Sequence, residues 1–184
     1  MTVTIGRREL LAALGGAEGR AMFPNVPQTI EFVQRVHAGR MGKAGAECWQ
    51  NPMAIMERLG PHATEAETLT ALLYGVLDEG THLTAKDLKL LGYPINVVAA
   101  VALLTRPQGM TYNEYIKQRI KNNPLARRIK IADLQHNLDP QRPMPGATIT
   151  EWYKYRKALA ELQPSKWLNV ARRARRVCSR WVHR

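Results

Sequence analysis

The chain has 184 residues, of which 45% are hydrophobic, and this is enough for one domain with a buried core. It lacks an apolar run of about 18 residues and begins without the pattern of a signal peptide, so we expect a cytoplasmic protein with no membrane span. Cys48 and Cys178 are far apart, which is typical of reduced thiols rather than a disulfide framework or zinc site. The net charge of +12 predicts attraction to polyanions: nucleic acid, nucleotides, acidic proteins or anionic membrane.

The first part of the chain predicts an arm followed by two helices. Residues 1–27 form the N-terminal arm, with a short helix over about 7–14 that Gly15 and Gly16 stop. A helix is then expected over residues 28–38, and Pro52 starts a short one after a glycine-rich loop.

The helix predicted over residues 66–79 is the one around which we expect the rest to pack. Thr64 and Glu67 have the spacing of a capping box, and Gly80 is a natural residue to follow the helix end. The apolar side chains recur every three or four residues, namely Leu69, Leu72, Leu73, Val76 and Leu77. The other side of this helix carries Tyr74, Gly75, Asp78 and Glu79.

The remaining segments are also helical by their caps and periodicity. Thr84 caps a brief helix that Gly92 ends, and Pro94 is the first residue of an all-apolar helix that we expect to be buried at the centre. Thr111 and Glu114 open another helix, Pro124 the next, and Thr150 caps one that reaches residue 162 after a proline-rich loop. A last helix is expected over residues 166–182. No segment alternates with period two, so we predict an all-α fold.

Three motifs follow one another between about residues 28 and 140. The first consists of His37, Gly39, Lys43, Gly45 and Pro52. The second covers residues 71–79, and the third consists of Lys130, Ala132, Asp133, His136 and Asn137. In order and spacing these motifs resemble those of the HD-domain hydrolases of the stringent-response Rel/SpoT type and their small single-domain relatives. The resemblance implies an HD-like helical domain over residues 28–163, with residues 164–184 as an added basic helix that packs on the domain or extends it.

The residues that would hold the family's divalent ion are mostly replaced. Two His and two Asp bind the metal in that family, and three of these positions are Asn51, Tyr74 and Gly75 in this chain, which leaves only Asp133. An amide is a weak ligand, a neutral phenol a poor one, and glycine has no side chain. We therefore expect no metal and no cofactor, and Asp133 is a vestige of the metal site.

The catalytic acid pair and the nucleotide loop of the family are changed as well. The acid pair is inverted to Asp78 and Glu79, which could act as general acid and base or simply face solvent or a cation such as Lys130. The arginine of the family's nucleotide loop is Gly42 in this chain.

A nucleotide pocket could remain at the same place. Its candidate residues are Lys43, Tyr74, Lys130, His136 and Asn137. Two structural alternatives are open: Asp133, His136 and Asn137 could brace the end of their helix, and Tyr74 could fill the vacated metal site instead of stacking on a base.

The last predicted helix lies outside the family pattern and is strongly basic. Residues 165–184 contain seven Lys and Arg and no Asp or Glu. On a helical projection the apolar arc includes Trp167 and Trp181, and the opposite arc carries Arg172, Arg173, Arg175, Arg176 and Arg180. Five arginines without carboxylates favour phosphate or carboxylate contacts of a polyanion. The alternative is that they pair with acids elsewhere in the fold; membrane binding is disfavoured because the apolar arc is weak.

Three functional hypotheses follow. The leading one is a non-catalytic HD-fold binding protein that acts through a basic surface on a polyanion or an acidic protein. The second is a metal-dependent phosphohydrolase of the (p)ppGpp 3′-pyrophosphate type with an altered site, which would use manganese. The third is an inhibitor or adaptor that blocks a nucleic-acid-binding partner.

Overall fold

The computed structural model describes residues 24–42, 45–78, 80–141 and 148–163, and in these the chain is all-α. The elements are α2 (Val26–Val36), α3 (Gln50–Leu59), α4 (Glu65–Leu72), α5 (Ala85–Leu90), α6 (Ile95–Leu104), α7 (Tyr112–Glu114), the π-helix η1 (Tyr115–Ile120), α8 (Pro124–Asn137) and α9 (Ile149–Leu162). Within these ranges no strand occurs, only an isolated bridge between Met41 and Glu47. In the same ranges no helix is both long and apolar enough to cross a bilayer.

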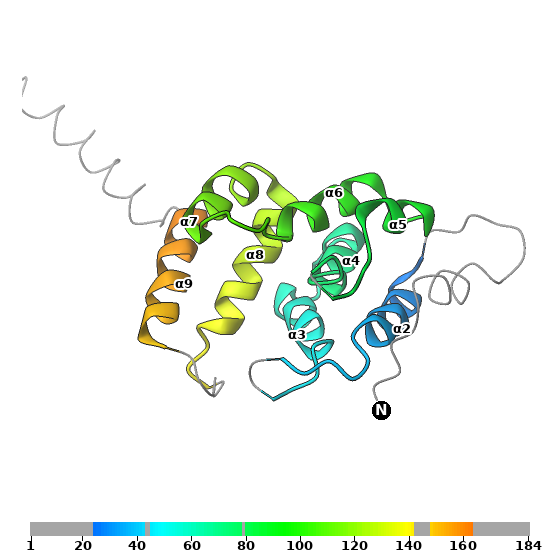
Figure 1. The fold of residues 1–184 in the computed structure, drawn as a ribbon, viewed down its shortest axis with the longest axis horizontal. Coiled ribbons are helices and arrows are strands. Elements are labelled where there is room, and N and C mark those ends of the chain that lie inside the picture. Colours follow the sequence, from blue (N-terminus) through cyan, green and yellow to red (C-terminus); the bar gives the residue numbers. More distant parts are fainter. Residues whose placement is uncertain (1–23, 43–44, 79, 142–147, 164–184) are drawn as a thin grey trace, which may run out of the picture.

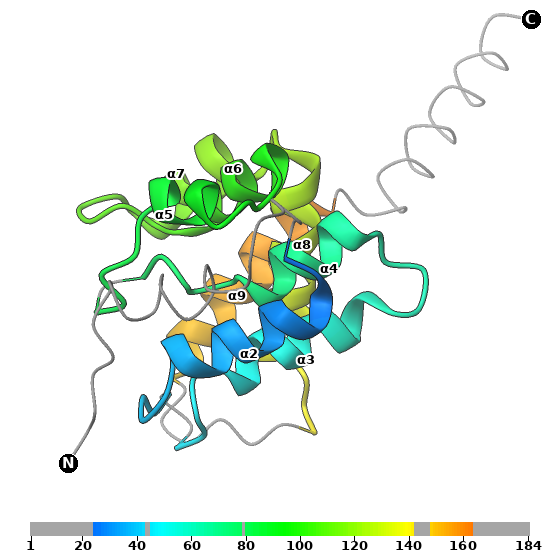
Figure 2. The same cartoon turned by 90° about the vertical axis from the view of Figure 1, so that its right-hand side faces the viewer.

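Helix α4 lies at the centre, where it packs against α2, α3, α6 and α8. Figure 1 shows α9 at one end of the molecule and α2 at the other, with α3, α4 and α8 between them. Figure 2 shows α5, α6 and α7 on one side and α2 and α3 on the other. The prediction that the rest of the chain packs around this helix is consistent with this arrangement.

The N-terminus of α4 is formed as predicted. The Thr64 amide donates to the Glu67 carboxylate at 2.9 Å, and the Glu67 amide donates to the Thr64 hydroxyl at 3.3 Å. These two bonds satisfy amide groups that have no partner within the helix. The helix begins where the capping box places it.

The end of α4 is not where the sequence analysis placed it. The helix ends at Leu72, followed by Leu73 as C-cap, and a run of turns leads to Asp78. Gly75 has a φ of +82°, which a right-handed helix does not contain, so the prediction of a helix to residue 79 is wrong. Gly80 also has a positive φ, but it belongs to a later turn.

Two clusters of buried side chains form the core. The first joins α2, α4, α5 and α6 through residues such as Phe32, Leu72, Leu88 and Val101. The second joins α3, α4, α6, η1, α8 and α9 through residues that include Ile55, Ala71, Leu104, Ile120, Ile129 and Leu162. Because α4 and α6 contribute to both clusters, the described helices form one continuous body. Of the five apolar side chains in the stripe predicted over residues 66–79, four are buried and Leu77 is partly buried.

Other helix boundaries and one burial prediction also need correction. Helix α2 begins and ends two residues earlier than expected, since Asn25 caps it. Pro94 is the N-cap rather than the first residue of α6, and Ile95 is 74% exposed, so α6 is buried on one side only. Thr148 caps α9 through Glu151, so Thr150 lies inside the helix. The last predicted helix, over residues 166–182, lies outside the described residues, as does most of the N-terminal arm.

Candidate functional site

Helix α8 places three polar side chains on one face. Lys130, Asp133 and Asn137 are three and four residues apart, so they lie one above another along the helix. Lys130 Nζ donates to Asp133 Oδ2 at 2.8 Å. Asn137 Nδ2 donates to Asp133 Oδ1 at 2.8 Å and to the Asp133 backbone carbonyl at 2.9 Å. Both carboxylate oxygens of Asp133 are therefore engaged by side chains of its own helix.

Tyr74 completes this group from the turn after α4. Its hydroxyl donates to Asp133 Oδ2 at 3.0 Å and accepts a bond from Lys130 Nζ at 2.8 Å. We call Tyr74, Lys130, Asp133 and Asn137 the Lys130–Asp133 cluster. Because α4 ends at Leu72, Tyr74 lies in the following turn, from which its hydroxyl reaches the cluster. The structure thus brings together four of the predicted site residues.

Three aromatic rings surround the Lys130 ammonium. Its nitrogen lies 5.3 Å from the centre of the Tyr74 ring, 5.7 Å from Tyr112 and 5.6 Å from Tyr115. Tyr112 and Tyr115 are not among the residues that the sequence predicts for this site. Both follow the Thr111 cap, three residues apart, and tyrosines at this spacing on one helix face were the available signal. Rings at these distances stabilise a cation through their quadrupole.

The electrostatics of the cluster favour a fixed ion pair. Burial alone would lower the pKa of the Lys130 ammonium, but the Asp133 carboxylate and the tyrosines outweigh it and hold this pKa well above its usual value. Burial, and next the Asp133 charge, raises the pKa of Tyr74 well above its usual value. Tyr74 therefore stays a neutral phenol, and its hydroxyl donates a hydrogen bond to the Asp133 carboxylate.

The cluster does not fit the divalent ion that the family resemblance implies. A metal at Asp133 would have to displace the Lys130 ammonium, which already supplies the positive charge there. Tyr74 is a neutral phenol, and a metal ligand must offer a charged or strongly donating atom. Within the described ranges no group of three or more His, Cys, Asp or Glu is placed to hold an ion.

The other predicted site residues are not members of this four-residue cluster, and several lie outside the described ranges. Asn51 is partly buried in the first turn of α3, and His136 is partly buried on α8. Asp78 is exposed in the turn after Gly75. Lys43, Glu79 and the arginines predicted to bind a polyanion, Arg172, Arg173, Arg175, Arg176 and Arg180, lie outside the described residues.

The conformation of Gly75 opposes a return to the family's metal site. A side chain at φ +82° is strained, and a Cβ there would lie 3.3 Å from Asp78 Oδ2. From the sequence, restoring the site with Asn51→His, Tyr74→His and Gly75→Asp should create manganese affinity. The structure adds a cost to this change, because the new carboxylate would start from a strained backbone beside Asp78.

We predict that Gly75→Ala lowers the free energy of unfolding by about 1–2 kcal/mol, the cost of a left-handed conformation for a residue with a Cβ. Gly42→Ala is the matched control, since Gly42 has no positive φ and its added Cβ would meet only Ala46 O at 3.4 Å. Urea unfolding of both variants measures the difference. Equal stabilities would mean that the turn after α4 does not require glycine.

His37 is a second unusual buried group, separate from the cluster. It is 4% exposed, and in the described part of the chain neither ring nitrogen has a hydrogen-bond partner. Burial, with a smaller contribution from the Arg40 charge, lowers the pKa of His37 to about 4. The imidazole is therefore neutral at pH 7.

No protein-family model matches this chain, and no curated protein sequence matches it significantly. The motif resemblance therefore remains a hypothesis about fold and ancestry.

Proposed function

We propose that this protein has an HD-type helical scaffold without metal-dependent catalysis and that it acts by binding a polyanion through its basic surface. The observation that carries the proposal is the pairing of Asp133 with the Lys130 ammonium at 2.8 Å inside the protein. In the hydrolases that the motifs resemble, a metal would be expected at this carboxylate, whereas here a lysine of the same helix supplies the charge. The phosphohydrolase alternative requires this pair to open.

The distribution of carboxylates supports a polyanion partner. The chain has 27 Lys and Arg against 15 Asp and Glu, so at least 12 cations have no acid to pair with. Several acids already pair with other cations, namely Glu31, Glu67, Asp133, Asp139 and Glu161. Others bond to the N-caps of helices, namely Asp87, Glu114 and Glu151. Seven carboxylates then remain for 22 cations, and residues 165–184 contain no acid. The five arginines of residues 172–180 are therefore the proposed phosphate contacts.

The proposal predicts that duplex DNA binds with little sequence preference and with a steep dependence on salt. Phosphate contacts position a protein without specifying sequence. Neutralising roughly four phosphates gives a log–log slope of about −3.6, so affinity should fall on the order of 100-fold between 50 and 200 mM salt. A fluorescence anisotropy titration at several salt concentrations measures this slope.

The control variants locate the contacts. Replacing Arg172, Arg176 and Arg180 by Glu should flatten the slope, because three proposed contacts are reversed. Replacing Lys86, Lys89 and Arg127 by Glu changes the net charge equally at exposed positions elsewhere and should have a smaller effect. A chain ending at Gln163, with thermal unfolding as folding control, should also bind weakly. Equal affinity and slope in the intact and shortened chains would eliminate the arginines and direct attention to the loop around Arg40 and Lys43.

A further inference from the structure

The outward face of α9 is aromatic and basic, although it belongs to a helix that packs on the core. Its inward side chains include Ala158 and Leu162, which are buried. At helical spacing the outward positions carry Ile149, Trp152, Tyr153, Arg156 and Lys157. Three of these side chains are large and hydrophobic yet exposed: Ile149 at 74%, Trp152 at 41% and Tyr153 at 63%. No carboxylate lies among these five positions, so the face is cationic as well as aromatic.

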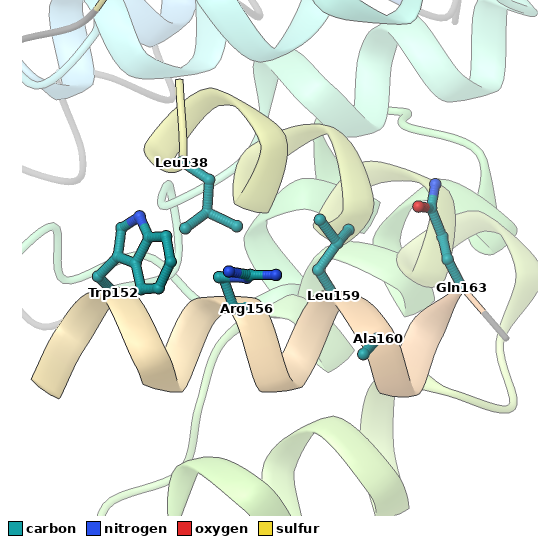
Figure 3. Close-up of a pocket in the computed structure, with 6 residues that line it drawn as sticks. All are labelled: Leu138, Trp152, Arg156, Leu159, Ala160 and Gln163. Carbon is teal, nitrogen blue, oxygen red and sulfur yellow. The ribbon is translucent and has the colours of Figure 1, made fainter. Parts of the chain in front are cut away.

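A groove runs along this face beside the end of α8. Its volume is about 350 Å³, at the lower end of the range for small-molecule sites. Six residues line it, namely Leu138, Trp152, Arg156, Leu159, Ala160 and Gln163. Figure 3 shows Leu138 opposite Trp152, with the Arg156 guanidinium between Trp152 and Leu159 and with Gln163 at the far end. The groove thus combines an indole, an apolar wall, one cation and one amide.

Arg156 is held without losing its hydrogen-bond donors. Its guanidinium carbon lies 4.7 Å from the centre of the Trp152 ring, and Tyr153 meets the same indole edge-on at 5.3 Å. A stacked guanidinium uses its face and keeps its N–H groups for phosphate. Among the described residues, Arg156 makes no ion pair with a carboxylate.

We propose that this face of α9 binds single-stranded nucleic acid, with a base stacked in the groove against the Trp152–Arg156 pair and phosphates on Arg156 and Lys157. This inference rests on the proposed polyanion function and adds a second contact surface and a preference among polyanions. Aromatic rings beside cations are the combination that binds single strands, because every base offers a face and every linkage a phosphate. Duplex DNA keeps its bases stacked internally and cannot supply one to Trp152.

Charge and shape favour this ligand over the other ligands of an exposed aromatic face. The net charge of +12 and the absence of carboxylates on the outward positions disfavour a basic partner. Aromatic and basic side chains also suit the surface of an anionic bilayer. A concave groove beside the indole fits a discrete planar group better than a flat lipid surface, so we assign the groove to a base.

The test compares a short oligothymidylate with an abasic oligomer of the same length, which carries the same phosphates but no bases. Trp152→Ala in the full chain should weaken oligothymidylate binding by roughly 5- to 150-fold, the measured range for removing one stacked base. Binding of the abasic oligomer should change by less than about twofold. Trp152→Phe should restore most of the oligothymidylate affinity, because stacking needs an aromatic ring. Leu90→Ala removes an exposed apolar side chain from α5, outside this face, and is the control that should have little effect.

The inference fails if Trp152→Ala, with the unfolding midpoint of the parent chain, weakens binding of both oligomers equally or of neither. It also fails if Trp152→Ala weakens binding only to vesicles of phosphatidylserine, which would assign the face to a membrane surface. If the parent chain binds the abasic oligomer and oligothymidylate equally well, the polyanion function stands and the base site fails. If it binds no polyanion at low salt, the proposed function itself fails.

Discussion

Lys130→Met is expected to lower the free energy of unfolding by about 3–5 kcal/mol. Methionine fills the space of the lysine stem but removes the charge that balances Asp133. The side chains of Lys130 and Asp133 are only 7% and 5% exposed, so the remaining carboxylate would lie unpaired inside the protein. Removing one partner of a buried ion pair costs about 3–5 kcal/mol, because the charge of the other partner is left without a counter-charge and away from water.

Urea and thermal unfolding measure the loss, which corresponds to a fall in Tm on the order of 10 °C for a domain of this size. The double variant Lys130→Met with Asp133→Asn should recover most of the stability. The asparagine oxygen can accept from Asn137, and its amide can donate to Tyr74. Arg35→Met is the control, since its pair with Glu31 is exposed at 3.6 Å and should contribute less than about 1 kcal/mol. A Lys130→Met loss no larger than that of Arg35→Met would contradict the description of the cluster.

His37 is expected to make the protein sensitive to mild acid. Its pKa is about 4 in the folded chain, whereas a free imidazole has a pKa near 6.5. Between these values the unfolded chain binds the extra proton, so stability rises with pH. The stability that comes from keeping the His37 imidazole neutral is fully present above about pH 6.5 and is lost as the pH falls to about 4. At about 1.36 kcal/mol per pKa unit, the loss reaches about 3 kcal/mol.

Urea unfolding of the parent chain and of His37→Leu across this pH range tests the prediction. At pH 7 the variant should be as stable as the parent or more stable, because both ring nitrogens of His37 lack partners among the described residues. Near pH 4.5 the variant should be clearly more stable. Carboxylates such as Asp139 titrate in both proteins and cancel in the difference. Parallel stability curves would show that His37 is not the acid-sensitive group.

The helix starts were predictable from the sequence where a local hydrogen-bond pattern defines them. The capping boxes at Thr64 and Thr111 involve side chains only three residues away, and the structure contains both. The start of α9 is predictable in the same way, because Thr148 and Glu151 have this spacing, and the prediction of a cap at Thr150 is wrong. The end of α4 was harder to predict, because Gly75 and Gly80 both suit a helix terminus and only the fold decides between them.

The Lys130–Asp133 cluster was predictable only in part. Lys130, Asp133 and Asn137 belong to one helix, and their spacing alone places them together. The Tyr74 hydroxyl is 56 residues from Lys130, and the rings of Tyr112 and Tyr115 reach the same ammonium from another element. Contacts of this kind depend on tertiary packing. The resemblance indicated an altered metal site but gave no reason to expect that a lysine supplies its charge.

Metal analysis of the purified full chain, with a manganese titration and an assay for pyrophosphate release from guanosine 3′-pyrophosphates, tests the central claim most directly. If Lys130 supplies the charge at Asp133, no transition metal should copurify in stoichiometric amount. Manganese should then bind weakly and support no release. A near-equimolar ion with hydrolysis that Asp133→Ala abolishes would contradict the account, because the carboxylate would then serve a metal instead of the lysine.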